Sequence, residues 1–139
     1  MTTKNYLLQA RRLNYKIENK MYEKDQLKAL LTSISSPVKD VNVQSSHSHD
    51  RVGDAICKIV MLEQEIDALA DSYVDTKNRI IQQMEQLDFK YYQILFYRYV
   101  MERHFEAIAQ CTGYTLRHVK RLHAEAIERF EEKFGTEYL

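Results

Sequence analysis

The chain has 139 residues, and its 20 Lys and Arg side chains balance its 20 Asp and Glu side chains. Only 3 glycines and 1 proline are present, which leaves few turn-forming residues and argues against an all-β or α/β fold. No run of 18 apolar residues occurs, so neither a membrane-spanning helix nor a membrane partner is expected. These features predict a soluble, all-α protein.

The two cysteines and the N-terminus indicate a cytoplasmic location. Cys57 and Cys111 are far apart and follow no metal-binding or redox spacing, which suits a reducing compartment. Both fall beside apolar helical positions, so we expect buried thiols. The first residues, MTTKNYLLQARR, lack the apolar core of a secretory signal.

A long amphipathic helix is predicted over residues 4–34, which contain neither Gly nor Pro. Apolar or small residues recur there in steps near three and four, at Tyr6, Ala10, Leu13, Ile17, Met21, Leu27, Leu31 and Ile34. Four lysines mark the expected wet face, Lys16, Lys20, Lys24 and Lys28. The predicted helix is too long for a compact globule of this size, which indicates a coiled-coil-like arm.

Residues 35–50 form the only clear linker. They hold the sole proline, Pro37, within a cluster of Ser, His, Asn and Asp residues that compete with regular backbone pairing. Asp50 is a candidate N-cap for the helix that follows. His47 and His49 are candidate zinc or nickel ligands, but no second cluster accompanies them, so we favour a loop without a metal.

A second long helix is predicted from Arg51 to about Gln86. Its apolar seam consists of Val52, Ile56, Ile59, Leu62, Ile66, Leu69, Tyr73, Ile80, Met84 and Leu87, with Lys77 at one seam position. The average step is close to 3.5 residues, which is the coiled-coil period. Two such helices most simply form an antiparallel hairpin, because neither stripe is stable when exposed. Pairing between chains is the alternative.

Three further helices are predicted at about 89–101, 103–111 and 115–134, together large enough to enclose a small core. The first is rich in aromatic residues at helical spacing, namely Phe89, Tyr91, Tyr92, Phe96, Tyr97 and Tyr99. Such residues can stack on bases of single-stranded nucleic acid. We favour core packing for this group instead.

The pattern of residues 105–124 predicts a helix-turn-helix, in which two short helices cross steeply around a tight turn. Ala109 is small at the expected crossing, and Gly113 stands where the turn needs a positive φ. Thr115 is placed to cap the second helix. The expected core residues are Ile108, Val119 and Leu122, and Phe105 is expected to anchor the start of the motif.

The second of these helices has two distinct faces when residues are rotated by about 100° each. One face gathers the apolar residues Val119, Leu122, Ala126 and Phe130, and the other gathers basic ones. A basic, uncluttered helix face suits insertion into a DNA major groove. The candidate DNA-binding residues are Thr115, Arg117, His118, Lys120 and Arg121. The alternative is an ordinary solvated face of a helical hairpin.

Residues 91–130 resemble region 4 of bacterial sigma factors. The resemblance rests first on the stretch with Leu95, Arg98 and Tyr99, which precedes the helix-turn-helix. It rests second on Ile108, Ala109 and Gly113, followed by Val119 and Ala126 in the next helix. It implies base- and phosphate-contacting roles for Arg117, Lys120 and Arg121. Sigma region 4 also contacts RNA polymerase, but that contact maps onto no residue here.

The whole chain is similar to small proteins of Gram-positive phages and prophages that join an N-terminal coiled coil to this domain. A serine-rich linker followed by aspartate and arginine is shared with them, at Ser45, Ser46, Asp50 and Arg51. These proteins are late transcriptional regulators of the ArpU or RinA type. Nothing here resembles sigma region 2, which argues against a complete sigma factor.

Together these features predict a helical hairpin over 1–87 and a helix-turn-helix domain over 88–139. The expected function is sequence-specific binding of double-stranded DNA in phage or prophage transcription control, within the bacterial cytoplasm, by a homo-oligomer formed through the hairpin. No catalytic residue, cofactor or metal is expected, because His104 and His123 lack a nucleophile or orienting carboxylate at helical spacing. A phage small terminase subunit and a coiled-coil adaptor without DNA binding are the alternatives.

Overall fold

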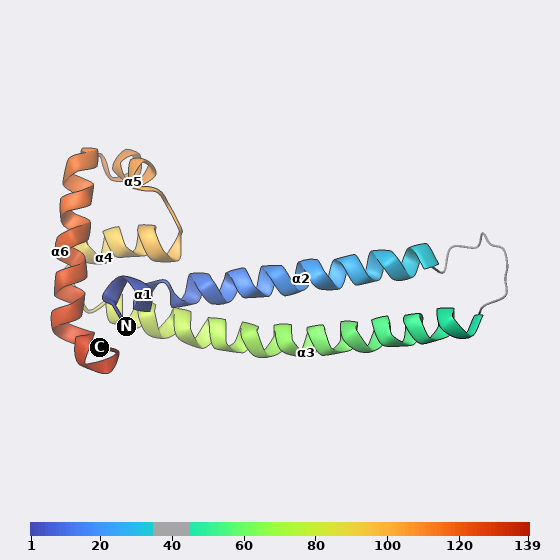
Figure 1. Cartoon of the computed structure of the whole chain (residues 1–139). Coiled ribbons are helices and arrows are strands. Elements are labelled where there is room, and N and C mark those ends of the chain that lie inside the picture. The colour runs from blue at the N-terminus through green and yellow to red at the C-terminus, as the bar shows by residue number, and fades with distance from the viewer. Residues whose placement is uncertain (35–44) are drawn as a thin grey trace. The chain divides into compact units, whose positions relative to one another are not determined.

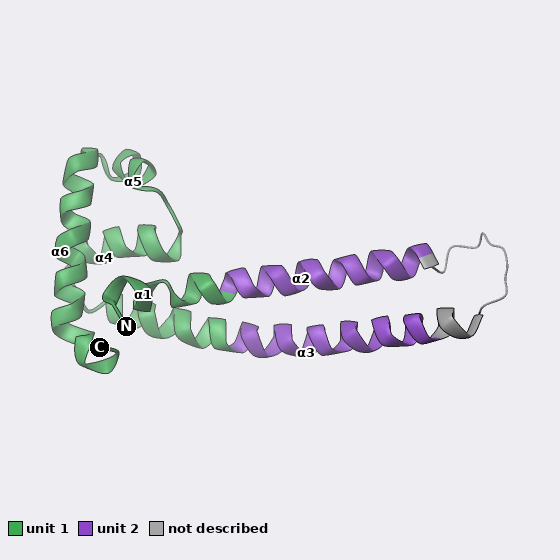
Figure 2. Cartoon of the chain, in the orientation of Figure 1, with its two compact units in different colours: residues 1–13, 72–139 green, residues 14–71 purple. Residues whose placement is uncertain are grey.

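The structure, a computed structural model, describes residues 1–34 and 45–139, except for the side chains of 34 and 45–49. Every regular element in these two ranges is helical, so the all-α prediction is confirmed for the described part of the chain. Two compact units are present (Figure 2), one made of residues 1–13 and 72–139 and the other of residues 14–71. The long helices α2 (Gln9–Ile34) and α3 (Ser45–Met84) each contribute to both units.

Within unit 14–71, α2 and α3 lie side by side and run in opposite directions (Figure 1). Ala55, Ile59 and Leu62 are the buried hydrophobic residues of this unit, and all three belong to α3. Across from them α2 places half-buried residues in alternating steps of three and four, at Ile17, Lys20, Lys24, Leu27 and Leu31. This spacing is the coiled-coil pattern expected from the sequence.

Several seam and surface positions in this unit differ from the prediction. Ile56 and Met21 are exposed by 49% and 45%, whereas Ala55 is buried at the seam position assigned to Ile56. Lys20 and Lys24 lie half-buried on the contact side rather than on a wet face. Lys20 remains charged there because its Nζ contacts Glu65 Oε2 of α3 at 2.7 Å, which lowers the pKa of the Glu65 carboxyl.

The linker is shorter than predicted, because α3 begins at Ser45 rather than at Arg51. Asp50 therefore lies inside the helix and is not its N-cap, as had been expected. Residues 35–44, with Pro37, lie outside the described residues. The side chains of Ser45, Ser46, His47 and His49 are likewise outside the description, so the linker histidines stay untested as metal ligands.

Unit 1–13 plus 72–139 contains the remaining elements. Residues Thr3–Leu7 form α1, Phe89–Leu95 form α4, and a π-helical turn η1 covers Phe96–Val100. Two helices follow, α5 (Phe105–Thr112) and α6 (Leu116–Phe134), and a 3₁₀ turn η2 covers Gly135–Glu137. The expected single helix over 89–101 is thus an α-helix that widens into a π turn, and the predicted first helix breaks at Leu8.

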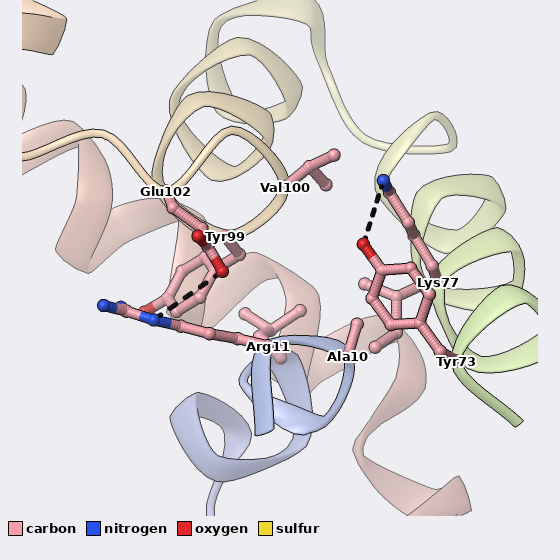
Figure 3. Close-up of a pocket in the computed structure, with 9 residues that line it drawn as sticks. Ala10, Arg11, Tyr73, Lys77, Tyr99, Val100 and Glu102 are labelled. Carbon is pink, nitrogen blue, oxygen red and sulfur yellow. Dashed lines mark hydrogen bonds and ion pairs between the residues drawn. The ribbon is translucent and has the colours of Figure 1, made fainter. Parts of the chain in front are cut away.

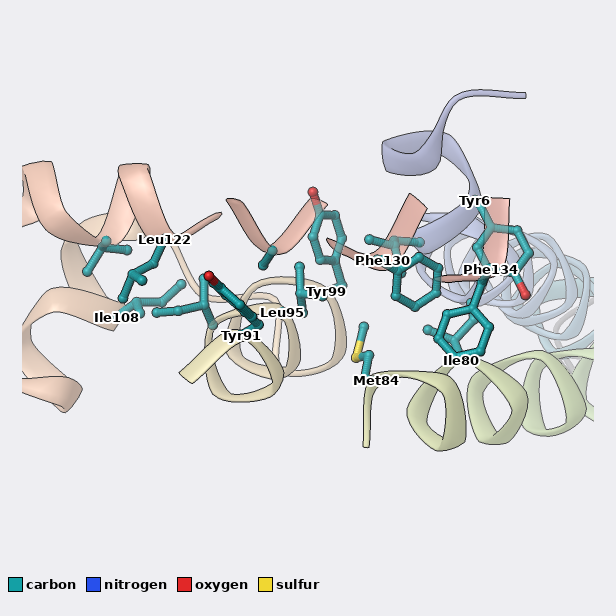
Figure 4. Close-up of a cluster of buried hydrophobic side chains, with 14 residues drawn as sticks. Tyr6, Ile80, Met84, Tyr91, Leu95, Tyr99, Ile108, Leu122, Phe130 and Phe134 are labelled. Atoms are coloured by element: carbon teal, nitrogen blue, oxygen red, sulfur yellow. The ribbon is translucent and has the colours of Figure 1, made fainter. Parts of the chain in front are cut away.

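One hydrophobic cluster fills this unit and collects side chains from every part of it (Figure 4). Phe130 of α6 is fully buried in this cluster. The centroid of its ring lies 5.9 Å from that of Tyr6 in α1 and 5.0 Å from that of Phe134. The cluster also takes in Ile80 and Met84 from the end of α3. Residues 1–13 and 72–87, assigned to the hairpin from the sequence, therefore help to build the core around α6.

The two ends of the chain lie close together (Figure 1), and polar contacts join residues near them. Thr3 Oγ1 donates to Glu131 Oε2 at 2.9 Å and lies 2.9 Å from the Tyr138 hydroxyl. The Tyr6 hydroxyl donates to Gln83 Oε1 at 2.7 Å. The rings of Tyr6 and Tyr138 stack with centroids 4.1 Å apart. Aromatic stacking and paired polar groups thus close this end of the core.

The predicted aromatic core is confirmed only in part. Tyr91 and Tyr99 are buried, with 6% and 7% exposure, but Phe89 is 71% exposed. Phe89 is the first residue of α4. The centroid of its ring lies 6.2 Å from that of Tyr92, and the centroid of the Tyr92 ring lies 5.6 Å from that of Phe96. Phe89 lies two positions before the buried Tyr91, about 200° around α4 from it, and so faces the opposite side of the helix.

Candidate functional site

The turn between α5 and α6 has the local geometry expected from the sequence. Gly113 ends α5 in the left-handed conformation, with φ of 79°, and its N–H donates to Ala109 O at 2.9 Å. Thr115 caps α6, because its hydroxyl accepts from the His118 N–H at 3.1 Å. Both local predictions are confirmed. Thr112 satisfies its hydroxyl within α5 by donating to Ile108 O at 2.7 Å.

The inner side of this helix pair is tightly packed. Ile108, Val119, Ala126 and Phe130 are fully buried, and Leu122 is 4% exposed. The rotation of the second helix assigned Val119, Leu122, Ala126 and Phe130 to the core, and the helix-turn-helix pattern assigned Ile108. Phe105, expected to anchor the start of the motif, is half-buried. The packing fixes which side of α6 faces outward.

The outer side of α6 presents the predicted basic residues. Arg117, Lys120 and Arg121 are exposed, and His118 is half-buried at the border, as expected. Thr115 is exposed, with its hydroxyl engaged in the cap. The structure therefore brings all five candidate residues together within the first two turns of one helix.

A row of contacts along this face was not predicted. Arg121 Nη2 lies 2.9 Å from His118 Nδ1 and is the donor of this hydrogen bond, because a guanidinium has no acceptor. The Tyr114 ring meets the His118 ring edge-on with centroids 4.8 Å apart. On its other side Arg121 Nε lies 4.0 Å from Glu125 Oε1. These pairs are three or four residues apart on one helix, and this spacing could have predicted them from the sequence.

The charge of α6 reverses along its length. The first two turns carry Arg117, Lys120 and Arg121 without an acid, whereas the second half carries four acids (Glu125, Glu128, Glu131 and Glu132) against two exposed bases (Arg129 and Lys133). Phosphate groups would be attracted to the first half and repelled by the second. The start of α6 is thus the part of this helix that favours an anionic partner.

The segment before α5 is held by Arg98, which the resemblance had singled out. Its guanidinium lies over the Phe105 ring at 4.4 Å from the centroid, and its Nη1 donates to Arg103 O at 3.2 Å. Glu102 has a φ of 56° and lies 3.7 Å from Arg11 through its carboxylate. These contacts fix the start of α5 relative to the core.

The histidines considered for catalysis have no suitable neighbours. His104 is exposed and precedes α5 without a side-chain cap. His123 is buried, and its Nε2 shares a hydrogen bond of 2.8 Å with the Tyr99 hydroxyl. Burial lowers the pKa of His123 from 6.5 to about 4 and raises the pKa of Tyr99, so both rings are neutral near pH 7. Their role is structural.

Unit 1–13 plus 72–139 contains a small pocket lined by residues of α2, α3 and η1, among others (Figure 3). Its rim carries the Arg11–Glu102 ion pair and Lys77, whose Nζ donates to the Tyr73 hydroxyl at 3.3 Å. The cavity measures about 10 Å³, which is room for roughly one water molecule. It does not accommodate a substrate or cofactor.

Other features of the described chain bear on the remaining expectations. Cys57 and Cys111 are exposed, so the expectation of buried thiols was wrong. Cys57 lies two positions from the buried Ala55 and Ile59, about 200° around α3 from each, which is the solvent side. Among the described residues no three His, Cys, Asp or Glu side chains gather as a metal site. None of the helices in this part of the chain is both long and apolar enough to cross a bilayer.

Comparison with known proteins returned no match to a family model, to a curated protein or to a solved structure.

Proposed function

We propose that the protein binds double-stranded DNA with sequence preference, with α5 and α6 acting as a helix-turn-helix and the start of α6 entering the major groove. The observation that supports this proposal is the exposed basic face of Arg117, Lys120 and Arg121 at the start of a helix whose opposite face is fully buried. Arg can read guanine edges with two hydrogen bonds, and Lys can neutralise phosphate.

The resemblance to sigma region 4 extends the proposal to transcription control in a phage or prophage. Arg117 and Arg121 are four residues apart and project from one face, so they reach neighbouring base pairs. The acidic second half of α6 favours an orientation in which the DNA crosses the start of the helix rather than following its length. RNA polymerase is the protein partner that the resemblance adds.

The test is binding of full-length protein to a duplex selected from a random pool. The Arg117→Ala, Arg121→Ala double variant removes no core contact, so its helix content and unfolding midpoint should match those of the parent. Its specific affinity should fall by about 1–3 kcal/mol for each guanine that is no longer read. A residue that touches only phosphate should instead reduce the salt slope by about one.

The matched control removes the same charge from exposed arginines of α3, in the Arg51→Ala, Arg79→Ala double variant. It should bind DNA as the parent does. Equal affinity of the parent and the Arg117, Arg121 variant would refute the proposed role of α6. If the parent protein binds no duplex DNA even at low salt, the result would favour the alternative of a coiled-coil adaptor without DNA binding.

Homo-oligomerisation through residues 4–87 stays a prediction. A single helix-turn-helix on a chain of zero net charge makes few phosphate contacts, and a two-fold dimer would double them. Sedimentation of the full-length protein at tens of micromolar tests the prediction. A monomer at that concentration would contradict it.

A further inference from the structure

Within unit 14–71, α3 carries an apolar surface that no other helix of the unit covers. Ile56, Val60 and Met61 are exposed by 49%, 46% and 53%, and Cys57 between them is exposed too. Residues at spacings of one, four and five lie together on a helix, so these four form one continuous patch. We call them the outer patch.

The pairing of α2 with α3 leaves the outer patch free. Ile59 lies at the centre of the buried side of α3. Val60 lies about 100° and Met61 about 200° around the helix from it. The outer patch therefore faces away from α2, and a partner for it must come from outside this unit.

Acidic side chains surround the outer patch. Asp67 and Asp71 follow Val60 by seven and eleven residues, which places them within about 20° of its line along the helix. Five exposed acids make up this acidic rim, namely Asp50, Asp54, Glu63, Asp67 and Asp71. None of the five forms an ion pair within the described ranges 1–34 and 45–139.

The bases of this stretch lie elsewhere. Arg51 and Lys58 are the only bases between Asp50 and Asp71 in the sequence. They lie about 180° and 160° around the helix from Val60. Lys58 acts instead on Glu65, on the side of α3 that faces α2, where its charge helps to lower the pKa of that carboxyl. Asp54 has Arg51 and Lys58 as neighbours three and four residues away, whereas Asp50, Glu63, Asp67 and Asp71 leave the border of the outer patch negative.

We propose that the outer patch docks a basic amphipathic helix of another protein. The apolar stripe of such a helix would cover Ile56, Val60 and Met61, while its Lys and Arg residues would face the acidic rim. A second copy of this chain fits less well, because a two-fold contact centred on the patch would bring the two acidic rims together. This inference is independent of DNA binding.

The test uses the full-length protein and a labelled synthetic peptide of about five helical turns, with Leu at helical spacing and Lys at the other positions. Saturable binding is expected in fluorescence anisotropy. The Ile56→Ser, Val60→Ser, Met61→Ser triple variant should weaken binding at least tenfold. The control variant is Met21→Ser, Tyr22→Ser, Leu30→Ser, which changes three residues of α2 whose exposed fractions are 45%, 67% and 52%. It should bind the peptide as the parent protein does.

A second pair of variants tests the acidic rim without touching the apolar residues. Asp67→Asn with Asp71→Asn should lower affinity at low salt and flatten its dependence on salt. Glu18→Gln with Asp25→Asn, which removes two exposed acids of α2, should do neither.

Three results would overturn the proposal. The first is that a peptide of the same composition in scrambled order binds as tightly as the amphipathic peptide. The second is that the Ile56→Ser, Val60→Ser, Met61→Ser variant binds the amphipathic peptide as tightly as the parent protein does. The third is a dimer of the parent in sedimentation that the outer-patch variant abolishes, because a second copy would then occupy the patch.

Discussion

The imidazole of His123 and the hydroxyl of Tyr99 share a buried hydrogen bond of 2.8 Å between α6 and the π turn η1. The Phe105 ring closes the other side of His123, edge-on, with centroids 5.1 Å apart. Burial is the main cause that lowers the pKa of His123 to about 4, and the charges of Lys4 and Arg98 act in the same direction. The imidazole is therefore held neutral where an unfolded chain would bind a proton.

This pKa predicts how stability depends on pH. Between pH 6.5 and about 4 the unfolded chain binds a proton at His123 that the folded protein does not bind. The free energy of unfolding should therefore fall as the pH falls through this window. Urea unfolding at a series of pH values measures the effect. In the His123→Gln variant, which keeps a polar group near Nε2 but does not titrate, the slope should be smaller; an unchanged slope would refute the assignment.

Two glycines should respond to alanine in opposite directions. At Gly113 a Cβ meets nothing within 4 Å, but the φ of 79° strains any L side chain, so Gly113→Ala should destabilise by about 1 kcal/mol. At Gly53, inside α3, a Cβ also meets nothing, and Gly53→Ala should stabilise by about 0.5–1 kcal/mol. Unfolding midpoints measure both. Gly113→Asn should recover part of the loss, since Asn tolerates this conformation.

The fragment 88–139, which the sequence marks as a domain, should not fold on its own. It lacks four buried partners of the α6 core, Tyr6, Leu7, Ile80 and Met84. Removal of one such side chain costs about 2–5 kcal/mol, and the stability of a whole domain is about 5–15 kcal/mol. Circular dichroism should show no cooperative melting for the fragment. A chain with 14–71 replaced by a flexible linker should still melt cooperatively, and a sharp transition of the fragment would contradict the prediction.

The local features of the fold were readable from the sequence because they depend on neighbouring residues. The left-handed Gly113, the Thr115 cap and the outward side of Arg117 and Arg121 each follow from a few positions along the chain. The assignment of Ile56 to the seam was wrong because an average spacing near 3.5 residues is equally compatible with Ala55 and with Ile56 at that position. The core contribution of Tyr6 depends on contacts with Gln83, Phe130 and Tyr138, which lie more than 70 residues away and which no local spacing records.

The contact between His118 and Arg121 predicts a positioning role on the proposed DNA-binding face. If His118 Nδ1 holds Arg121 in place, His118→Ala should relax the base preference at the position that Arg121 reads. His118→Asn should restore that preference, because its side-chain oxygen lies near the former Nδ1 and accepts the same hydrogen bond. Selection from random duplexes measures the preference for each variant. Loss of preference in both variants would indicate direct contact of His118 with DNA instead.

The unit that contains α6 is built from two separate stretches of chain, residues 1–13 and 72–139, and this affects folding during synthesis on the ribosome. The first 13 residues emerge early, but Thr3 bonds to Glu131 and Tyr138, and Tyr6 stacks on Tyr138. Contacts so distant in sequence slow folding, because a long loop must close before they form. Residues 14–71 make a compact unit of neighbouring helices, so they are free to pair while the rest is translated. The basic face of α6 would be presented only once translation has reached the residues that lock its core.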